Sequence, residues 1–437
     1  MDIEQKYKKV FEGMEEIISE RVKNKKYMAM GYTSNLDMLC DFQVERLNGL
    51  LKEYMPDAKL SDMRPAGSIV TMPDLLETLV YYCSNGIGGE VDVENTALVE
   101  ESFQFEFGMG GTAVQAALAL SELGCPSLVH LTDNSKEVCD ILNTPFVYTI
   151  NEDGRLVHTD KIIQTQEQEV HFIIQFKKGD KIDLGHQEIE IPCSNRLILT
   201  KVTVNKSVPF SMPYFQWVEE NARQVSSNVL SSFNVILDSA ILKERLDYVE
   251  QHVKVYRRHN PGGIVYFEDA HYHDDTVRRL CLETVYSCVD IVSLNEEELK
   301  YTLEMYRFPA DIEDIISCVK GAKFIREKFG IHRGVIVHTK DYSMYVGEQL
   351  EADIETGLIY GNLLATAKAR NGWYGTREQI KEVLGLECSS KGVEGARKVA
   401  ESEYASEVVL VPSKYIDKPK YTIGLGDSFV GGVQICF

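Results

Sequence analysis

Four consecutive residues near the C-terminus, Gly424-Leu425-Gly426-Asp427, have the types and order needed to move a phosphoryl group. Two glycines bracket one residue just before an apolar helical segment, which predicts a turn whose backbone N–H groups converge on one point. Such a turn at a helix N-terminus binds phosphate. The Asp427 carboxylate can accept a proton from an attacking hydroxyl while the turn stabilises the transferring group. The alternative is a plain glycine turn with Asp427 as helix cap.

Acidic and amide side chains follow two apolar runs that read as buried strands. Glu268 ends the run 263–267, and Asn295 and Glu298 follow the run 290–294. Carboxylates together with water and phosphate oxygens are the ligands that Mg²⁺ prefers. The alternatives are solvated acids in the first case and a capped, acid-rich first helical turn in the second.

Near the N-terminus, Asn35 and Asp37 follow a third apolar run, and Gly110-Gly111-Thr112 precedes an Ala-rich helical segment at 113–123. Amide and carboxylate groups beside a glycine turn can bind sugar hydroxyls through paired hydrogen bonds. They can equally serve as turn formers.

The elements that must position these residues alternate between strands and helices. Between the later apolar runs lie helical patterns, and this order is typical of a layered α/β domain with a mostly parallel sheet. Open sheets of this kind bind ligands at the carboxyl ends of their strands. The expected strands are 27–32, 127–131, 234–237, 263–267, 290–294, 334–338 and 407–411.

Two regions interrupt this alternation. Residues 41–105 are irregular and polar, and residues 146–205 alternate like an antiparallel meander. We expect both to form one smaller lid over the carboxyl edge of the sheet. The predicted lid domain is therefore 41–105 with 146–205, and the large domain is 1–40, 106–145 and 206–437.

Composition limits the classes of partner. The formal charge of −21 over 437 residues disfavours nucleic acid, whose binding needs clustered Lys and Arg. No apolar run approaches the ~20 residues that cross a bilayer, and no signal peptide is recognisable at the start, so a cytoplasmic protein without membrane contact is expected. The ten cysteines are expected to be reduced.

Taken in order, these segments resemble the ADP-dependent sugar kinases, the glucokinase and phosphofructokinase branch of the ribokinase-like superfamily. Gly424-Leu425-Gly426-Asp427 is similar to the family's G-x-G-D motif, and Asn295 with Glu298 matches its N-x-x-E motif. Glu268 falls where the family has H-x-E, although Tyr266 replaces the His.

The resemblance implies a role for each remaining candidate. Asp427 would be the catalytic base within the turn of Gly424, Leu425 and Gly426, and Mg²⁺ would lie near Glu268, Asn295 and Glu298. Sugar would be bound by Asn35, Asp37, Glu90, Gly110, Gly111, Thr112 and His171. The nucleotide and its phosphates would be bound by Arg196, Asn295, His338, Val411 and Pro412.

The expected protein is thus a ribokinase-like α/β kinase with a smaller α/β lid, which transfers a phosphoryl group from ADP to a glucose-like hexose with Mg²⁺. Three alternatives remain open: an ADP-dependent 6-phosphofructokinase, an ATP-dependent sugar or nucleoside kinase of this fold, and a non-catalytic sugar-binding relative. The expected partners are small molecules, a sugar and a nucleotide. The sequence leaves the oligomeric state open.

Overall fold

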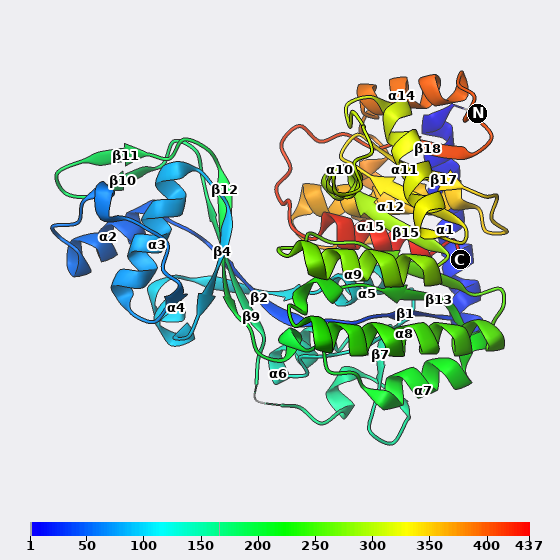
Figure 1. Ribbon diagram of the computed structural model, residues 1–437, viewed down its shortest axis with the longest axis horizontal. Helices are drawn as coiled ribbons and strands as arrows, with labels where there is room; N and C mark the ends of the chain where they lie inside the picture. The colour runs from blue at the N-terminus through cyan, green and yellow to red at the C-terminus, as the bar shows by residue number, and fades with distance from the viewer. Residues whose placement is uncertain (1, 166) are drawn as a thin grey trace.

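The computed structural model describes residues 2–165 and 167–437, and it shows two lobes of unequal size (Figure 1). In these ranges the larger lobe is built on a ten-stranded sheet in the order β18-β17-β16-β15-β14-β13-β1-β6-β7-β8. Strands β7, β6, β1 and β13 to β16 run parallel, whereas β8, β17 and β18 pair antiparallel with their neighbours. Their bounds are β1 Tyr27–Met30, β6 Ser127–Val129, β7 Val147–Ile150, β8 Leu156–Val157, β13 Val225–Leu230, β14 Ile264–Glu268, β15 Ile291–Asn295, β16 Gly334–His338, β17 Tyr342–Gly347 and β18 Val408–Pro412.

Helices cover both faces of this sheet. Side chains of β1 show the layering: Met28 and Met30 pack into one apolar core, and Tyr27 and Ala29 into the other. One face carries α1 Ile3–Lys23, α5 Thr112–Ser121, α12 Ile354–Asn371, α13 Arg377–Val383 and α15 Leu425–Gln434. The other carries α7 Met212–Glu220, α8 Ser239–His259, α9 Asp275–Val285, α10 Glu296–Met305, α11 Ile315–Phe329 and α14 Ser390–Ala400. The expected three-layer α/β class is confirmed.

The smaller lobe is a six-stranded sheet in the order β3-β4-β12-β9-β2-β5, with helices on one face (Figure 1). Its strands are β2 Asn35–Cys40, β3 Ser68–Ile69, β4 Gly89–Val93, β5 Phe105–Gly110, β9 Val170–Phe176 and β12 Asn195–Lys201. The remaining elements are α2 Val44–Tyr54, α3 Met72–Asn85, α4 Thr96–Ser102 and the ribbon of β10 Lys181–Asp183 and β11 Glu188–Glu190, while the short α6 Lys136–Leu142 follows β6. None of the helices in the described ranges is long and apolar enough to cross a membrane.

The strand pairing gives the lid domain other boundaries than the sequence predicts. Asn35 lies opposite Gly110 and Asp37 opposite His171, so β2 and β5 belong to the lid sheet although 1–40 and 106–145 were assigned to the large domain. Conversely, β7 and β8 extend the large sheet, although they fall in 146–205. The expected meander is therefore wrong: β9 pairs antiparallel with β12 but parallel with β2.

One expected strand is also wrong. Residues 233–235 form a single 3₁₀ turn, and the strand that lies beside β1 is β13, residues 225–230. Its buried middle is polar, and the Asn228 amide there contacts His252 Nε2 at 2.9 Å. His252 satisfies the hydrogen bonding of the buried Asn228 amide. Because polar residues occupy the middle of this strand, it does not appear in the sequence as an apolar run.

Candidate active site between the lobes

Gly424 holds the backbone conformation that starts helix α15. Its φ of 67° is left-handed, and a Cβ there would collide with Gln115 Oε1 and Lys368 Nζ. Leu425, Gly426 and Asp427 are the first residues of the helix, whose N–H groups have no partner within the helix. The turn is therefore suited to bind an anion, as expected.

The same helix is held close to its neighbours by two further glycines. A Cβ on Gly431 would lie 2.9 Å from the Ala116 carbonyl oxygen in α5, and one on Gly432 would lie 2.5 Å from that of Tyr360 in α12. Because α5 and α12 flank α15, their polar side chains reach the turn. This packing brings together residues that are far apart in the sequence.

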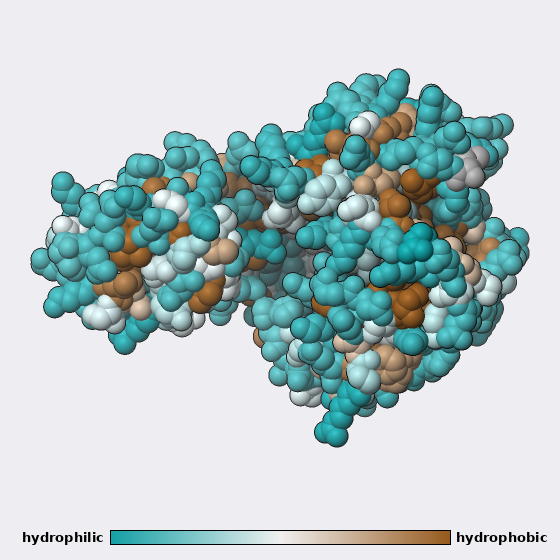
Figure 2. Space-filling model, turned by 90° about the horizontal axis from the view of Figure 1, so that it is seen from above, coloured by the Kyte–Doolittle hydropathy of each residue, from teal (hydrophilic) through white to brown (hydrophobic). Residues whose placement is uncertain are grey.

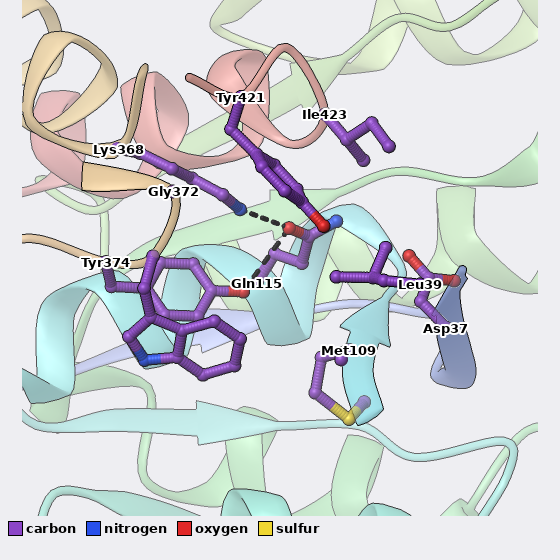
Figure 3. A pocket seen from close by; sticks show the side chains of 11 residues that line it. Asp37, Leu39, Met109, Gln115, Lys368, Gly372, Tyr374, Tyr421 and Ile423 are labelled. Atoms are coloured by element: carbon purple, nitrogen blue, oxygen red, sulfur yellow. Dashed lines mark hydrogen bonds between the residues drawn. The ribbon is translucent and has the colours of Figure 1, made fainter. Parts of the chain in front are cut away.

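A pocket in front of the turn joins the two lobes; of the expected sugar ligands Asp37 lines it, and Asn35 and His171 lie beside Asp37. Asn35 Nδ2 donates to Asp37 Oδ1 at 2.7 Å and lies 3.2 Å from His171 Nδ1. A Cβ on Gly110 would collide with Asn35 and Asp37, which explains a glycine there. The pocket is lined by Asp37, Leu39, Gly108, Met109, Gln115, Lys368, Gly372, Trp373, Tyr374, Tyr421 and Ile423 (Figure 3).

Asp37 is the one expected site residue among these; three of the others, Gln115, Lys368 and Tyr374, contact one another. Lys368 Nζ donates to Gln115 Oε1 at 2.5 Å, and Tyr374 Oη donates to the same oxygen at 3.3 Å (Figure 3). The ammonium also lies 4.3 Å from the centre of the Tyr374 ring. The only sequence signal was one Lys in an otherwise small and apolar stretch of a helix, 363–369.

Burial perturbs the charged groups of this pocket. It raises the pKa of Asp37 to about 7, against the hydrogen bond from Asn35, and nearby Asp427 adds to the rise. Burial also raises the pKa of Asp427, which Lys368 and Thr112 oppose. The pKa of Lys368 falls to about 8 because of its burial, although both carboxylates favour its charged form. A carboxylate with a raised pKa in a cleft is suited to accept a proton near neutral pH.

The polar face of the lid sheet carries the other expected ligands. Glu90 Oε1 accepts from Thr200 Oγ1 at 2.8 Å, and Glu90 Oε2 lies 3.4 Å from His273 Nε2 in the large lobe. Burial lowers the pKa of His171, with Glu90 opposing, so the imidazole is neutral at pH 7. Arg196 is exposed at the start of β12, opposite Gln175. Figure 2 shows the hollow between this lobe and the larger one.

The expected metal residues meet at the carboxyl ends of β14 and β15. Burial raises the pKa of Glu298 to about 8, and the neighbouring Asp269 and Glu268 carboxylates raise it further. Glu268 Oε1 contacts His338 Nε2 at 2.9 Å, and Glu268 Oε2 is buried without a partner among the described residues. Burial lowers the pKa of His338, but the carboxylates of Glu268, Glu298 and Glu296 together raise it above its ordinary value.

The capping interpretation of Asn295 is also correct. Asn295 Oδ1 accepts from the N–H groups of Glu297 and Glu298 at 2.9 Å, and Glu298 Oε2 accepts from the Asn295 N–H. Asp269 is neutralised by Arg278 at 3.1 Å, which removes it from the candidates for a metal ligand. Over 2–165 and 167–437 no group of three or more His, Cys, Asp or Glu is arranged to hold a metal alone. The carboxylates nevertheless fit a cation that takes its other ligands from phosphates and water.

A second, larger cleft lies on the other side of the turn. Asn295, His338, Thr422, Leu425 and Gly426 line it, together with the loop Ser413–Asp417. Val411 and Pro412, expected at the nucleotide, instead lie behind the cleft: Val411 is fully buried, and the Pro412 carbonyl accepts from Tyr7 Oη at 2.7 Å. The strand ends one residue later than expected, so the loop after it lines the cleft.

Comparisons with known proteins agree with this arrangement. The profile of the ADP-specific phosphofructokinase/glucokinase conserved region matches residues 26–432. The ADP-dependent glucose/glucosamine kinase of Pyrococcus abyssi is 26% identical over 94% of each chain, and the ADP-specific phosphofructokinase of Pyrococcus furiosus is 23% identical over 93% of this chain and 95% of that one. The crystal structure of a hypothetical ADP-dependent phosphofructokinase from Pyrococcus horikoshii superposes with a TM-score of 0.79 at 19% identity, covering 94% of this chain and 97% of that one. This chain therefore belongs to the ADP-specific phosphofructokinase/glucokinase family of sugar kinases, phosphotransferases that act on an alcohol group.

Proposed function

We propose that the protein phosphorylates an unphosphorylated, glucose-like hexose, with ADP as donor and Mg²⁺ as cofactor. The single observation that carries this proposal is the position of the glycine turn between two pockets. Ile423 lines the pocket that joins the lobes, and Leu425 and Gly426 line the cleft on the other side of the turn. A sugar in the first pocket and a nucleotide in the second would meet at Asp427.

The chemistry follows from that placement. Asp427 takes the proton of the attacking sugar hydroxyl, while the N–H groups of the turn stabilise the charge that develops on the phosphoryl group. Asp37, Asn35 and neutral His171 orient the sugar through hydrogen bonds. Glu268 and Glu298 would hold Mg²⁺, whose charge neutralises the phosphate oxygens. Closure of the lid excludes water, which competes with the sugar as acceptor.

Arg196 remains the proposed partner of a nucleotide phosphate. It lies on the same face of the lid sheet as Ile198 and Thr200, two and four residues along β12. Thr200 contacts Glu90, which reaches the large lobe through His273. An exposed guanidinium on this face can grip a phosphate through two hydrogen bonds when the lobes close.

The charge of the lid face favours a sugar without a phosphate. Asp37, Glu90 and Asp92 all lie on it, as their register with His171, Ile198 and Thr200 shows. The lid lysines that could instead serve a sugar phosphate are Lys177 and Lys178, which follow the far end of β9, and Lys201, the last residue of β12. Lys201 alternates with Thr200 and therefore lies on the opposite face of the sheet. Six residues of strand separate Lys177 from His171, roughly 20 Å, which is too far for a phosphate on the bound sugar. Negative groups near the sugar would repel a sugar phosphate.

Removing the Glu90 carboxylate tests this choice of sugar. We expect wild type to prefer glucose over fructose 6-phosphate, and Glu90→Ala to lower kcat/KM for glucose by about 10–100-fold, because a hydrogen bond to a charged group contributes about 1.5–3 kcal/mol. Steady-state rates of sugar-dependent AMP formation from ADP measure both. Glu53→Ala, an exposed glutamate on α2, is the matched control.

The opposite sugar preference would contradict the proposed role of Glu90. If wild type prefers fructose 6-phosphate and Glu90→Ala changes neither rate, Glu90 has no part in sugar choice, and the protein is a 6-phosphofructokinase. That alternative is compatible with the phosphofructokinases among its relatives.

A further inference from the structure

Lys368 is a buried cation directly beneath the glycine turn. Its side chain comes from the last turn of α12, and the residue is only 4% exposed. Gln115 from α5 accepts from the ammonium, and the Tyr374 ring lies against it (Figure 3). A Cβ on Gly424 would collide with Nζ, which places the ammonium against the backbone of the turn.

The surroundings of Lys368 allow its charge to act on other groups that line the pocket. A lysine serving only the helix dipole would remain at the surface, where its charge is hydrated. Here the one oxygen that accepts from it belongs to a neutral amide, so the positive charge is not cancelled by its contact. The titratable groups around Lys368 and the two carboxylates are Asp37 from β2, Asp427 from α15, His171 from β9, whose Nδ1 lies 3.7 Å from Asp37 Oδ1, His338 from β16 on the side of the second cleft, and Tyr374 and Tyr421 from the loops after α12 and before α15.

The two carboxylates near Lys368 indicate a role for its positive charge. Asp37 and Asp427 are both needed as carboxylates, one to accept hydrogen bonds from the sugar and the other to accept its proton. The Asp427 carboxylate adds to the cost of ionising Asp37, because like charges in a desolvated site repel. A cation fixed between α5, α12 and the turn offsets that repulsion without blocking the pocket.

We propose that Lys368 is a positioning residue of the phosphoryl transfer, whose ammonium keeps the Asp37 and Asp427 carboxylates ionised and thereby sets the pH range in which the kinase works. The proposal rests on the proposed function, because it assigns those two carboxylates to the sugar and its proton. It also explains why Gln115 and Tyr374 converge on one buried lysine.

The test is the pH profile of kcat/KM for the sugar, which reports groups of the free enzyme. For wild type we expect activity to rise as pH approaches about 7, where Asp37 loses its proton, and to level off above it, because at high pH the carboxylates are ionised whether or not Lys368 keeps its charge. In Lys368→Met the acid limb moves upward by about one pH unit or more, since an opposite charge lowers a carboxylate pKa by about 1–3 units. At high pH, where both carboxylates are ionised without the ammonium, the variant approaches the wild-type rate.

Two further variants separate this role from a structural one. Lys368→Arg keeps a charge that does not titrate, so its acid limb should stay where wild type has it. Lys398→Met, an exposed lysine on α14, makes the same charge change away from the pocket and should leave the profile unchanged. ADP affinity by calorimetry checks folding, because the second cleft does not contain Lys368.

The outcomes are distinct. Lower rates in Lys368→Met at every pH, with the acid limb where wild type has it, would overturn the proposal and leave the proposed function standing. If wild type phosphorylates no sugar, the proposed function fails first and this proposal with it. Should Lys368→Arg fail to fold, the position of the acid limb in Lys368→Met decides alone.

Discussion

Asp427→Asn should reduce phosphoryl transfer by about 10²–10⁴-fold while the affinities for sugar and ADP change little. The amide has nearly the same shape as the carboxylate but cannot accept the proton of the attacking hydroxyl, and general base catalysis contributes about this factor. The barrier rises by roughly 3–5 kcal/mol. Single-turnover rates with saturating sugar and ADP measure the loss, and calorimetric titration of each ligand checks that the pockets are intact.

One outcome would contradict the assignment of Asp427 as the catalytic base. If Asp427→Asn keeps more than about a tenth of the wild-type kcat, the proton goes elsewhere and Asp427 is not the base. Asp353→Asn provides the matched control, because Asp353 also lies at a helix N-terminus, where its carboxylate accepts from the Thr356 N–H at 3.3 Å. It should reduce stability slightly and leave turnover unchanged.

Gly424→Ala should reduce kcat by at least about 100-fold, for a steric reason. A residue other than glycine at a left-handed φ costs about 1–3 kcal/mol, and the new methyl group would collide with Gln115 and Lys368. The turn must shift to relieve this collision, and a displacement on the order of 1 Å near reacting groups costs about 10²-fold. Rates with both substrates saturating, together with the thermal unfolding midpoint, measure the effect.

Other glycines provide graded controls for Gly424. Gly49 in α2 has nothing within 4 Å of an added Cβ, so Gly49→Ala should leave activity unchanged and stabilise the lid helix by about 0.5–1 kcal/mol. At Gly426 the added atom would lie 3.4 Å from His338 Cε1, which predicts an intermediate loss. Equal activity in Gly424→Ala and Gly49→Ala would show that the conformation of the turn does not matter for catalysis.

The parts of the site that lie at strand ends were predictable from the sequence. Glu268, Asn295 and His338 each end a short apolar run, and parallel strands bring their carboxyl ends to one edge of the sheet. Asp427 was recognisable because two glycines precede it at the start of an apolar helix. In each case the pattern of neighbouring residues in the sequence predicts where the side chain lies.

The parts that depend on distant pairing were not predictable. Gln115 and Lys368 are 253 residues apart, and only the packing of α5 and α12 on α15 brings them together. The assignment of β2 failed for a similar reason: it follows β1 directly but pairs with β5 and β9 of the other lobe. A single sequence gives no information on such pairs when each partner alone looks ordinary.

The most direct test of the whole account compares ADP with ATP as donor for the purified protein with glucose and Mg²⁺. We expect AMP and sugar phosphate in equal amounts from ADP, with a higher kcat/KM for ADP than for ATP. We also expect that chelation of Mg²⁺ stops the reaction. Formation of no sugar phosphate from ADP with any hexose or hexose phosphate, or equal or faster turnover with ATP, would contradict it.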